Sequence, residues 1–98
     1  MSNSSQYQLV LFISGASPNS VRALNNLKQI CEIHLKGNYK LEVVDVYQQP
    51  ELAKQEQIIA LPTLIRKNPT PTRHLIGDMS DRARVLRGLG INPSDIAI

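Results

Sequence analysis

The chain has 98 residues, of which 42% are hydrophobic and 19% are charged, so it fits one folded domain with a single modest core. Its one cysteine permits no internal disulfide bond, which is typical of a reducing compartment such as the cytoplasm. No apolar run approaches the roughly 18 residues of a membrane span, and the polar, uncharged start of the chain lacks the basic and apolar regions of a signal peptide. We therefore expect a cytoplasmic protein without membrane contact, with a disordered N-terminus at 1–6, a domain at 7–90 and a short tail at 91–98.

The net charge of +3 is concentrated between residues 66 and 87, where six basic and two acidic side chains give a net charge of +4. The basic residues are Arg66, Lys67, Arg73, Arg82, Arg84 and Arg87. Such a segment forms either a solvated face or a patch that binds nucleic acid or an acidic protein surface. The four aromatic residues are not interleaved with these charges as a stacking platform requires, so we expect a protein partner and no nucleic acid.

The first half of the chain has the pattern of a strand–helix–strand unit. Residues 7–13, Y-Q-L-V-L-F-I, are almost continuously apolar from Leu9, which predicts a strand buried on both faces. Ser17 suits the cap of a helix that extends to about residue 35. The apolar stripe expected on this helix consists of Val21, Leu24, Leu27, Ile30, Cys31 and Leu35. Residues 41–47, L-E-V-V-D-V-Y, predict a second strand, parallel to the first because a helix separates the two.

The second half is divided into shorter elements. They are expected at 50–59 (helix), 63–67 and 73–76 (strands) and 81–89 (helix, capped by Ser80). The resulting order, βαβαββα, is that of a thioredoxin-like α/β fold. In thioredoxin-like proteins the proline that corresponds to Pro62 is usually cis, and both isomers of the Leu61–Pro62 bond are compatible with the sequence.

Thioredoxins carry two cysteines between the first strand and the first helix, where this chain has S-G-A-S-P-N-S at 14–20. Serine hydroxyls do not perform the thiolate chemistry of disulfide exchange. Cys31 lies on the apolar stripe and is expected to be a buried core residue. His34 and His74 lie in unrelated segments, and no Gly-Lys-Ser/Thr motif indicates a phosphate-binding loop. We therefore expect no enzymatic activity, no metal site and no cofactor.

Three stretches of the sequence together resemble the KaiB family of bacterial clock proteins. They are S-P-N-S-V-R-A-L-N-N-L-K at 17–28, V-D-V-Y-Q-Q-P-E-L-A at 44–53, and the run from I-I-A-L-P-T-L to I-G-D-M-S-D-R at 58–82. The resemblance covers nearly the whole domain. It implies a non-enzymatic regulator that binds a KaiC-type hexameric ATPase and modulates its phosphorylation cycle. Further partners implied by it are KaiA and a sensor histidine kinase whose input domain is thioredoxin-like.

The resemblance also implies two folds. KaiB proteins exchange a rare thioredoxin-like monomer, which binds KaiC, with a ground state of order βαββααβ that is usually a tetramer. We therefore expect a homo-oligomer, either a tetramer or a dimer. Matching positions imply partner-binding roles for Arg22, Tyr39, Arg73 and Asp78, and fold-switch roles for Pro62, Gly88 and Gly90. In the family, replacement of the glycine at position 88 favours the binding fold.

Three alternatives stay open. Gly90 stands where clock members typically have Asp, Gln57 stands where many have Lys, and the ending I-N-P-S-D-I-A-I has a single acid. These departures are compatible with a KaiB-like protein that serves stress adaptation through another partner. A redox enzyme that uses Cys31 would lose its activity in a Cys31→Ser variant. A nucleic-acid adaptor that uses the basic segment would bind in a steeply salt-dependent manner.

Overall fold

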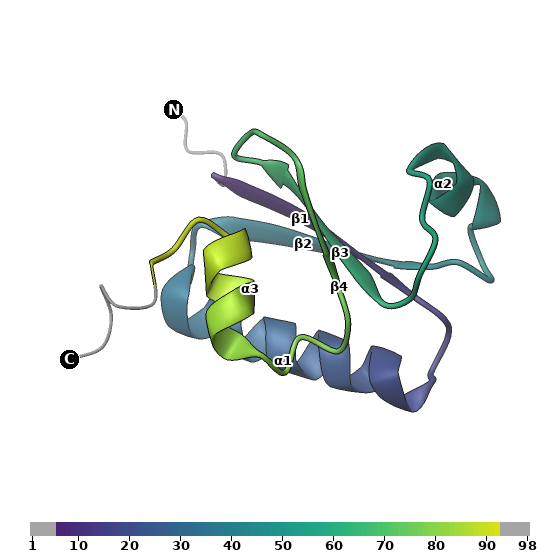
Figure 1. The fold of residues 1–98 in the computed structure, drawn as a ribbon, viewed down its shortest axis with the longest axis horizontal. Coiled ribbons are helices and arrows are strands. Elements are labelled where there is room, and N and C mark those ends of the chain that lie inside the picture. The colour runs from purple at the N-terminus through teal and green to yellow at the C-terminus, as the bar shows by residue number, and fades with distance from the viewer. Residues whose placement is uncertain (1–5, 93–98) are drawn as a thin grey trace.

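The computed structural model describes residues 6–92, which form a four-stranded sheet flanked by helices (Figure 1). The elements are β1 (Tyr7–Ile13), α1 (Pro18–His34), β2 (Tyr39–Asp45), α2 (Pro50–Gln55), β3 (Thr63–Asn68), β4 (Arg73–Ile76) and α3 (Arg82–Gly88). Their order, βαβαββα, is the predicted one. The disordered start expected at 1–6 and the tail expected at 91–98 lie almost entirely outside the described residues.

The strands lie in the order β2–β1–β3–β4, so β1 is in the interior of the sheet and β2 and β4 are its edges. β1 and β2 are parallel, in a register that runs from Tyr7 opposite Tyr39 to Ile13 opposite Asp45. The crossover through α1 predicts this direction. β3 is antiparallel to both β1 and β4.

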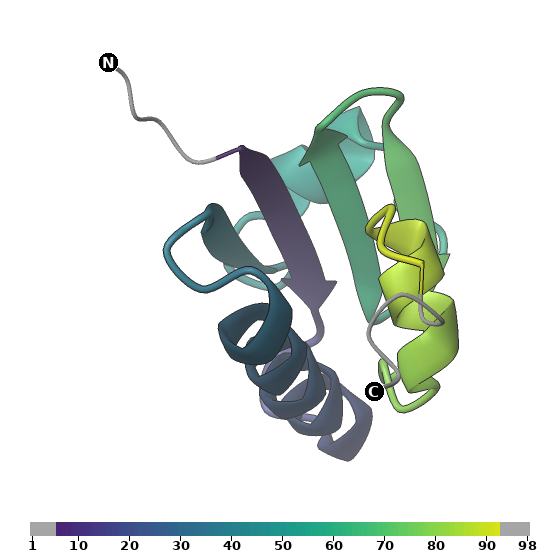
Figure 2. The same ribbon diagram turned by 90° about the vertical axis from the view of Figure 1, so that its left-hand side faces the viewer.

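Helices cover both faces of the sheet, with α1 and α3 on one face and α2 on the other (Figure 1 and Figure 2). The larger core joins Leu9 and Leu11 of β1 to the buried sides of α1 and α3. On the opposite face Phe12, Val44 and Ile65 form a smaller cluster with the residues of and after α2. β1 is therefore buried on both faces, as its nearly continuous apolar sequence predicts.

The buried stripe of α1 differs from the predicted one at its N-terminal end. Val21 is 45% exposed, whereas Ser20 and Ala23 are buried against the sheet. These two small residues allow the first turns of the helix to lie close to the end of β1, where the hydroxyl of Ser20 accepts a hydrogen bond from the N–H of Ser14 at 3.0 Å. The prediction for Val21 was wrong because hydrophobicity alone does not show which face needs small side chains.

The predicted ends of two further elements were wrong by a few residues. β2 begins at Tyr39 and ends at Asp45, since it pairs with β1 along its whole length. α2 ends at Gln55, because Gln57 adopts a left-handed backbone conformation with φ 56° that does not continue a helix.

The predicted cap of α3 was also wrong. Asp81, not Ser80, caps this helix, and its carboxylate accepts a hydrogen bond from the N–H of Arg84 at 3.2 Å. The backbone N–H of Ser80 instead donates to the Asp78 carboxylate at 3.0 Å, which places Ser80 in the preceding turn.

Candidate partner-binding site

The junction between β1 and α1, where thioredoxins carry their cysteines, is a turn held by hydroxyl groups. Ser17 caps α1 by accepting a hydrogen bond from the N–H of Ser20 at 3.3 Å. The hydroxyl oxygens of Ser14, Ser17 and Ser20 lie 2.8–3.4 Å from one another. The N–H of Gly15 donates to the carboxylate of Asp45, at the end of β2, at 3.1 Å. These groups satisfy each other, so the junction has a structural role.

Cys31 lies inside the larger core, with 0% of its surface exposed. Burial raises the pKa of its thiol to about 12, and the negative charge of Glu32 adds to this effect. Because thiol exchange requires the thiolate, this environment suppresses the reactive form. The redox alternative therefore has no support in the surroundings of the thiol.

Residues 6–92 contain no group of three or more His, Cys, Asp or Glu side chains that could hold a metal ion. His34 is in the last turn of α1, and His74 is exposed on β4. No helix within the same part of the chain is long and apolar enough to cross a bilayer.

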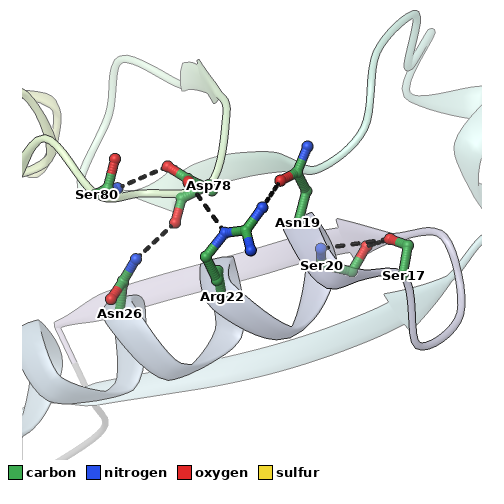
Figure 3. A network of polar contacts seen from close by, with 7 residues as sticks. All are labelled: Ser17, Asn19, Ser20, Arg22, Asn26, Asp78 and Ser80. Carbon is green, nitrogen blue, oxygen red and sulfur yellow. Dashed lines mark hydrogen bonds and ion pairs between the residues drawn. The ribbon is translucent and has the colours of Figure 1, made fainter.

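Two of the predicted partner-binding residues, Arg22 and Asp78, form an ion pair, with Nε of Arg22 at 3.4 Å from Oδ2 of Asp78 (Figure 3). The Arg22 guanidinium also donates to the side chain of Asn19. The side-chain amide of Asn26 donates to the Asp78 carbonyl at 2.9 Å, and the N–H of Ser80 donates to its carboxylate at 3.0 Å. This network joins α1 to the turn between β4 and α3.

The charge of Asp78 is stabilised by its neighbours. Hydrogen bonds from Ser80, followed by those from the Arg22 guanidinium and its positive charge, hold the pKa of the Asp78 carboxyl below its usual range. The Arg22 side chain remains 56% exposed, so the pair is screened by solvent and contributes little to stability. Its main effect is to orient the turn, while part of the guanidinium stays accessible to a partner.

Tyr39 and Arg73 lie apart from this network. Each is the first residue of an edge strand, at the end of the sheet where β1 begins. The Tyr39 hydroxyl donates to Oε2 of Glu32 at 2.7 Å, and this hydrogen bond raises the pKa of Tyr39 to about 12. Arg73 is exposed on β4, opposite Arg66. The four predicted residues therefore do not form one site, because only Arg22 and Asp78 are brought together.

The basic segment between residues 66 and 87 does not form one surface patch. Arg66 is only 6% exposed and donates to the carbonyls of Gly88 and Pro71. Arg84 donates to a carbonyl at the end of β4, and Lys67 pairs with the glutamate that follows α2. The expectation of a solvated face or a binding patch was wrong for Arg66, because its side chain is enclosed where β3 lies against the end of α3. The arginines of this segment whose side chains stay exposed and form no hydrogen bond or ion pair with residues 6–92 are Arg73, Arg82 and Arg87.

The predicted fold-switch residues lie at restricted places. The Leu61–Pro62 bond is cis, as is usual for thioredoxin-like proteins, and Gly90 follows α3 with φ +84°. A Cβ on Gly88 would lie 2.4 Å from Cδ1 of Leu75. In this fold Gly88→Ala is therefore expected to be unfavourable, which is opposite in direction to the effect that the family resemblance implies.

The sequence analysis did not consider Ile59, the most exposed large hydrophobic residue within 6–92. Ile59 is 91% exposed and borders two shallow hollows, one beside His74 and Ile76 of β4 and the other beside Leu61. Its neighbour Ile58 packs into the core beneath α2. The adjacent isoleucines were the available signal, because a partly buried Ile58 next to an exposed Ile59 follows once α2 ends at Gln55.

Comparison with known proteins identifies the family. The family model of the KaiB domain matches residues 10–91. The circadian clock oscillator protein KaiB of Prochlorococcus marinus subsp. pastoris is 52% identical, over 87% of this chain and 79% of that protein. The protein of the same name from Synechococcus elongatus is 48% identical, over 93% of this chain and 89% of its own length. The chain belongs to the KaiB family.

Solved structures confirm the fold of this KaiB-family chain. The N-terminal domain of Synechococcus elongatus SasA is 22% identical with a TM-score of 0.73, covering 92% of this chain and 89% of that one. Mitochondrial thioredoxin 3 from Saccharomyces cerevisiae is 15% identical with a TM-score of 0.72, and the match covers 88% of this chain and 78% of the thioredoxin. At these identities the likeness shows a thioredoxin-like fold and nothing of the activity.

Proposed function

We propose that this KaiB-family chain is a non-enzymatic clock regulator that binds a KaiC-type hexameric ATPase and modulates its phosphorylation cycle. The observation that carries the proposal is the family match over residues 10–91, with about half of the positions identical to proteins named circadian clock oscillator protein KaiB. The buried thiol of Cys31 and the mutually bonded hydroxyls at the start of α1 offer no competing chemistry.

Ile59 is the proposed anchor for the ATPase. Exposed apolar side chains contribute most to binding where a partner encloses them completely, with weaker contacts around them. Ile59 stands between two hollows that a partner's side chains can fill, and polar residues such as Glu56 and His74 surround it. It lies on the segment between α2 and β3, so a partner can dock there without contacting α1 or α3 (Figure 1).

The remaining partners are proposed on the family resemblance alone. They are KaiA and a sensor histidine kinase whose thioredoxin-like input domain would compete with this chain for the ATPase. Exposed parts of Arg22 and Arg73 are available for such contacts. A tetrameric or dimeric ground state with the order βαββααβ and a cytoplasmic location stay predictions.

The test of the anchor is the affinity of variants of the fluorescently labelled chain for the KaiC-type ATPase of the same genome, measured by anisotropy. Ile59→Ser is expected to weaken binding at least about tenfold, since truncating an enclosed apolar anchor costs roughly 2 kcal/mol or more. Ile33→Ser is the matched control, because Ile33 is 62% exposed but lies on α1. Equal affinities for the two variants would reject Ile59 as the anchor, and an absence of binding by the unaltered chain would reject the proposed function.

A further inference from the structure

Arg66 is a charged side chain enclosed by the molecule. It is 6% exposed, and no carboxylate of residues 6–92 forms an ion pair with it. Its Nη1 donates to the carbonyl of Gly88 at 3.1 Å and its Nη2 to the carbonyl of Pro71 at 2.8 Å. Its Nε has no partner in the part of the chain that the structure describes. Within residues 6–92, the cost of burying this charge is therefore offset by hydrogen bonds to two backbone carbonyls.

The two carbonyls belong to different segments. Gly88 is the last residue of α3, and Pro71 lies in the turn between β3 and β4. Carbonyls in the last turn of a helix have no partner within the helix and form the negative end of its dipole, so a guanidinium is a favourable partner for them. A single side chain of β3 thus joins the β3–β4 turn to the end of α3.

Gly90 makes room for this guanidinium and closes the helix. Its φ is +84°, and its N–H donates to the carbonyl of Arg87 at 3.0 Å while the N–H of Ile91 donates to that of Leu86 at 2.8 Å. These paired bonds are those of a Schellman motif, whose left-handed position favours glycine. A Cβ on residue 90 would lie 3.2 Å from Nη1 of Arg66. Residue 90 is therefore restricted both by its backbone conformation and by the close approach of Arg66.

We propose that Arg66 and Gly90 form a clamp that makes the β3–β4 turn and the C-terminal end of α3 open together, while β1, α1 and β2 stay folded. The clamp bonds reach only the turn and α3, and none of them involves α1 or β2. A separate hydrogen bond joins α3 to β4: the Arg84 guanidinium donates to the carbonyl of Ile76 at 2.9 Å. This bond lies toward the start of α3, away from the clamp. This inference concerns the chain alone and holds whether or not the chain binds the proposed ATPase.

The test is hydrogen exchange of the full chain, followed by mass spectrometry in the absence of any partner. Arg66→Met keeps the apolar stem but removes the donors. Peptides covering 66–74 and 82–91 are then expected to exchange about tenfold faster, because hydrogen bonds from a charged group are stronger than those between neutral groups. Peptides from α1 are expected to keep their rates. Arg66→Lys, which retains a single donating group, is expected to give an intermediate acceleration in both C-terminal regions.

Two matched variants separate the clamp from general effects. Arg82→Met removes an exposed arginine of the same helix and is expected to leave the rates unchanged. Gly37→Ala introduces a Cβ at φ +76° with nothing within 4 Å, so it measures the cost of the backbone conformation alone. Gly90→Ala is expected to accelerate exchange in both C-terminal regions more than Gly37→Ala accelerates exchange in any region. When Arg66 is already replaced by Met, the additional acceleration caused by Gly90→Ala is expected to be smaller.

Three results would overturn the clamp. The first is acceleration of α3 in Arg66→Met or Arg66→Lys with an unchanged β3–β4 turn. The second is equal acceleration of all peptides, including those from α1. The third is that the effects of Arg66→Met and Gly90→Ala on the free energy of opening, as obtained from the exchange rates, are additive, since independent residues show no coupling.

Discussion

The two halves of the molecule share one core, but they differ in how far side-chain bonds to the backbone supplement it. In β1, α1 and β2, long elements place apolar side chains at regular intervals in a shared core. From β3 to α3 the elements have four to seven residues, and side chains such as Arg66, Arg84 and Asp81 bond directly to backbone groups. The first half therefore depends mainly on burial, and the second half adds individual bonds and close approaches to its share of the same core, which includes Leu64, Val85 and Leu89.

The largest effect is expected in the half that depends on burial. Leu27 of α1 has 0% exposure, so Leu27→Ala should lower the free energy of unfolding by about 2–5 kcal/mol through lost burial and the cavity that remains. Urea denaturation followed by circular dichroism measures this change. Val21→Ala, on the exposed side of the same helix, should cost far less, and similar losses for the two variants would contradict the buried stripe described here.

The second effect concerns close packing between α3 and β4. Gly88→Ala places a methyl group 2.4 Å from Cδ1 of Leu75, and overpacking of this kind costs about 1–3 kcal/mol. Alanine gains about 1 kcal/mol in helix propensity, so the same denaturation measurement should show a net loss of about 1 kcal/mol. Combining Gly88→Ala with Leu75→Ala should relieve the overpacking, because the Leu75 side-chain atoms that the new methyl group meets are then absent. A Gly88→Ala variant that is more stable in this fold would contradict the packing and agree with the family's behaviour.

A smaller effect is expected at the start of α3. Asp81→Ala removes the acceptor for the N–H of Arg84 and should cost about 1 kcal/mol, the usual value of a helix cap. Asp81→Asn retains an acceptor and should lose much less, and Ser80→Ala should leave the helix cap intact. Thermal unfolding compares the three variants, and a greater loss in Ser80→Ala than in Asp81→Ala would restore Ser80 as the cap.

The smallest effect is a dependence on pH at the turn between β4 and α3. The pKa of Asp78 is lowered in the folded chain, so its contribution to stability is fully present above the unfolded value of about 3.9 and is lost as the pH falls through the folded value. Asp78→Asn should therefore flatten the decline of stability in acid. Urea unfolding at a series of pH values measures this, and an unchanged profile would show that the carboxylate does not contribute.

The same contrast explains what the sequence could predict. The order of elements, the parallel strands and the buried Cys31 follow from apolar spacing and element length. The burial of Arg66 could not be predicted, since it depends on how the end of α3, which supplies the Gly88 carbonyl, packs over β3. The pairing of Arg22 with Asp78 depends likewise on how α3 packs beside α1. The exposure of Ile59 follows from the early end of α2 at Gln55.

The central proposal is that this KaiB-family chain acts by binding a KaiC-type ATPase. The most direct test is a time course of mixtures with the ATPase of the same genome, followed by native mass spectrometry, using the unaltered chain and Cys31→Ser. We predict a complex that forms over minutes to hours with one copy per ATPase subunit, and the same complex with Cys31→Ser. Failure of the unaltered chain to bind an ATPase shown to be active, or loss of the complex in Cys31→Ser with an unchanged fold, would contradict this account.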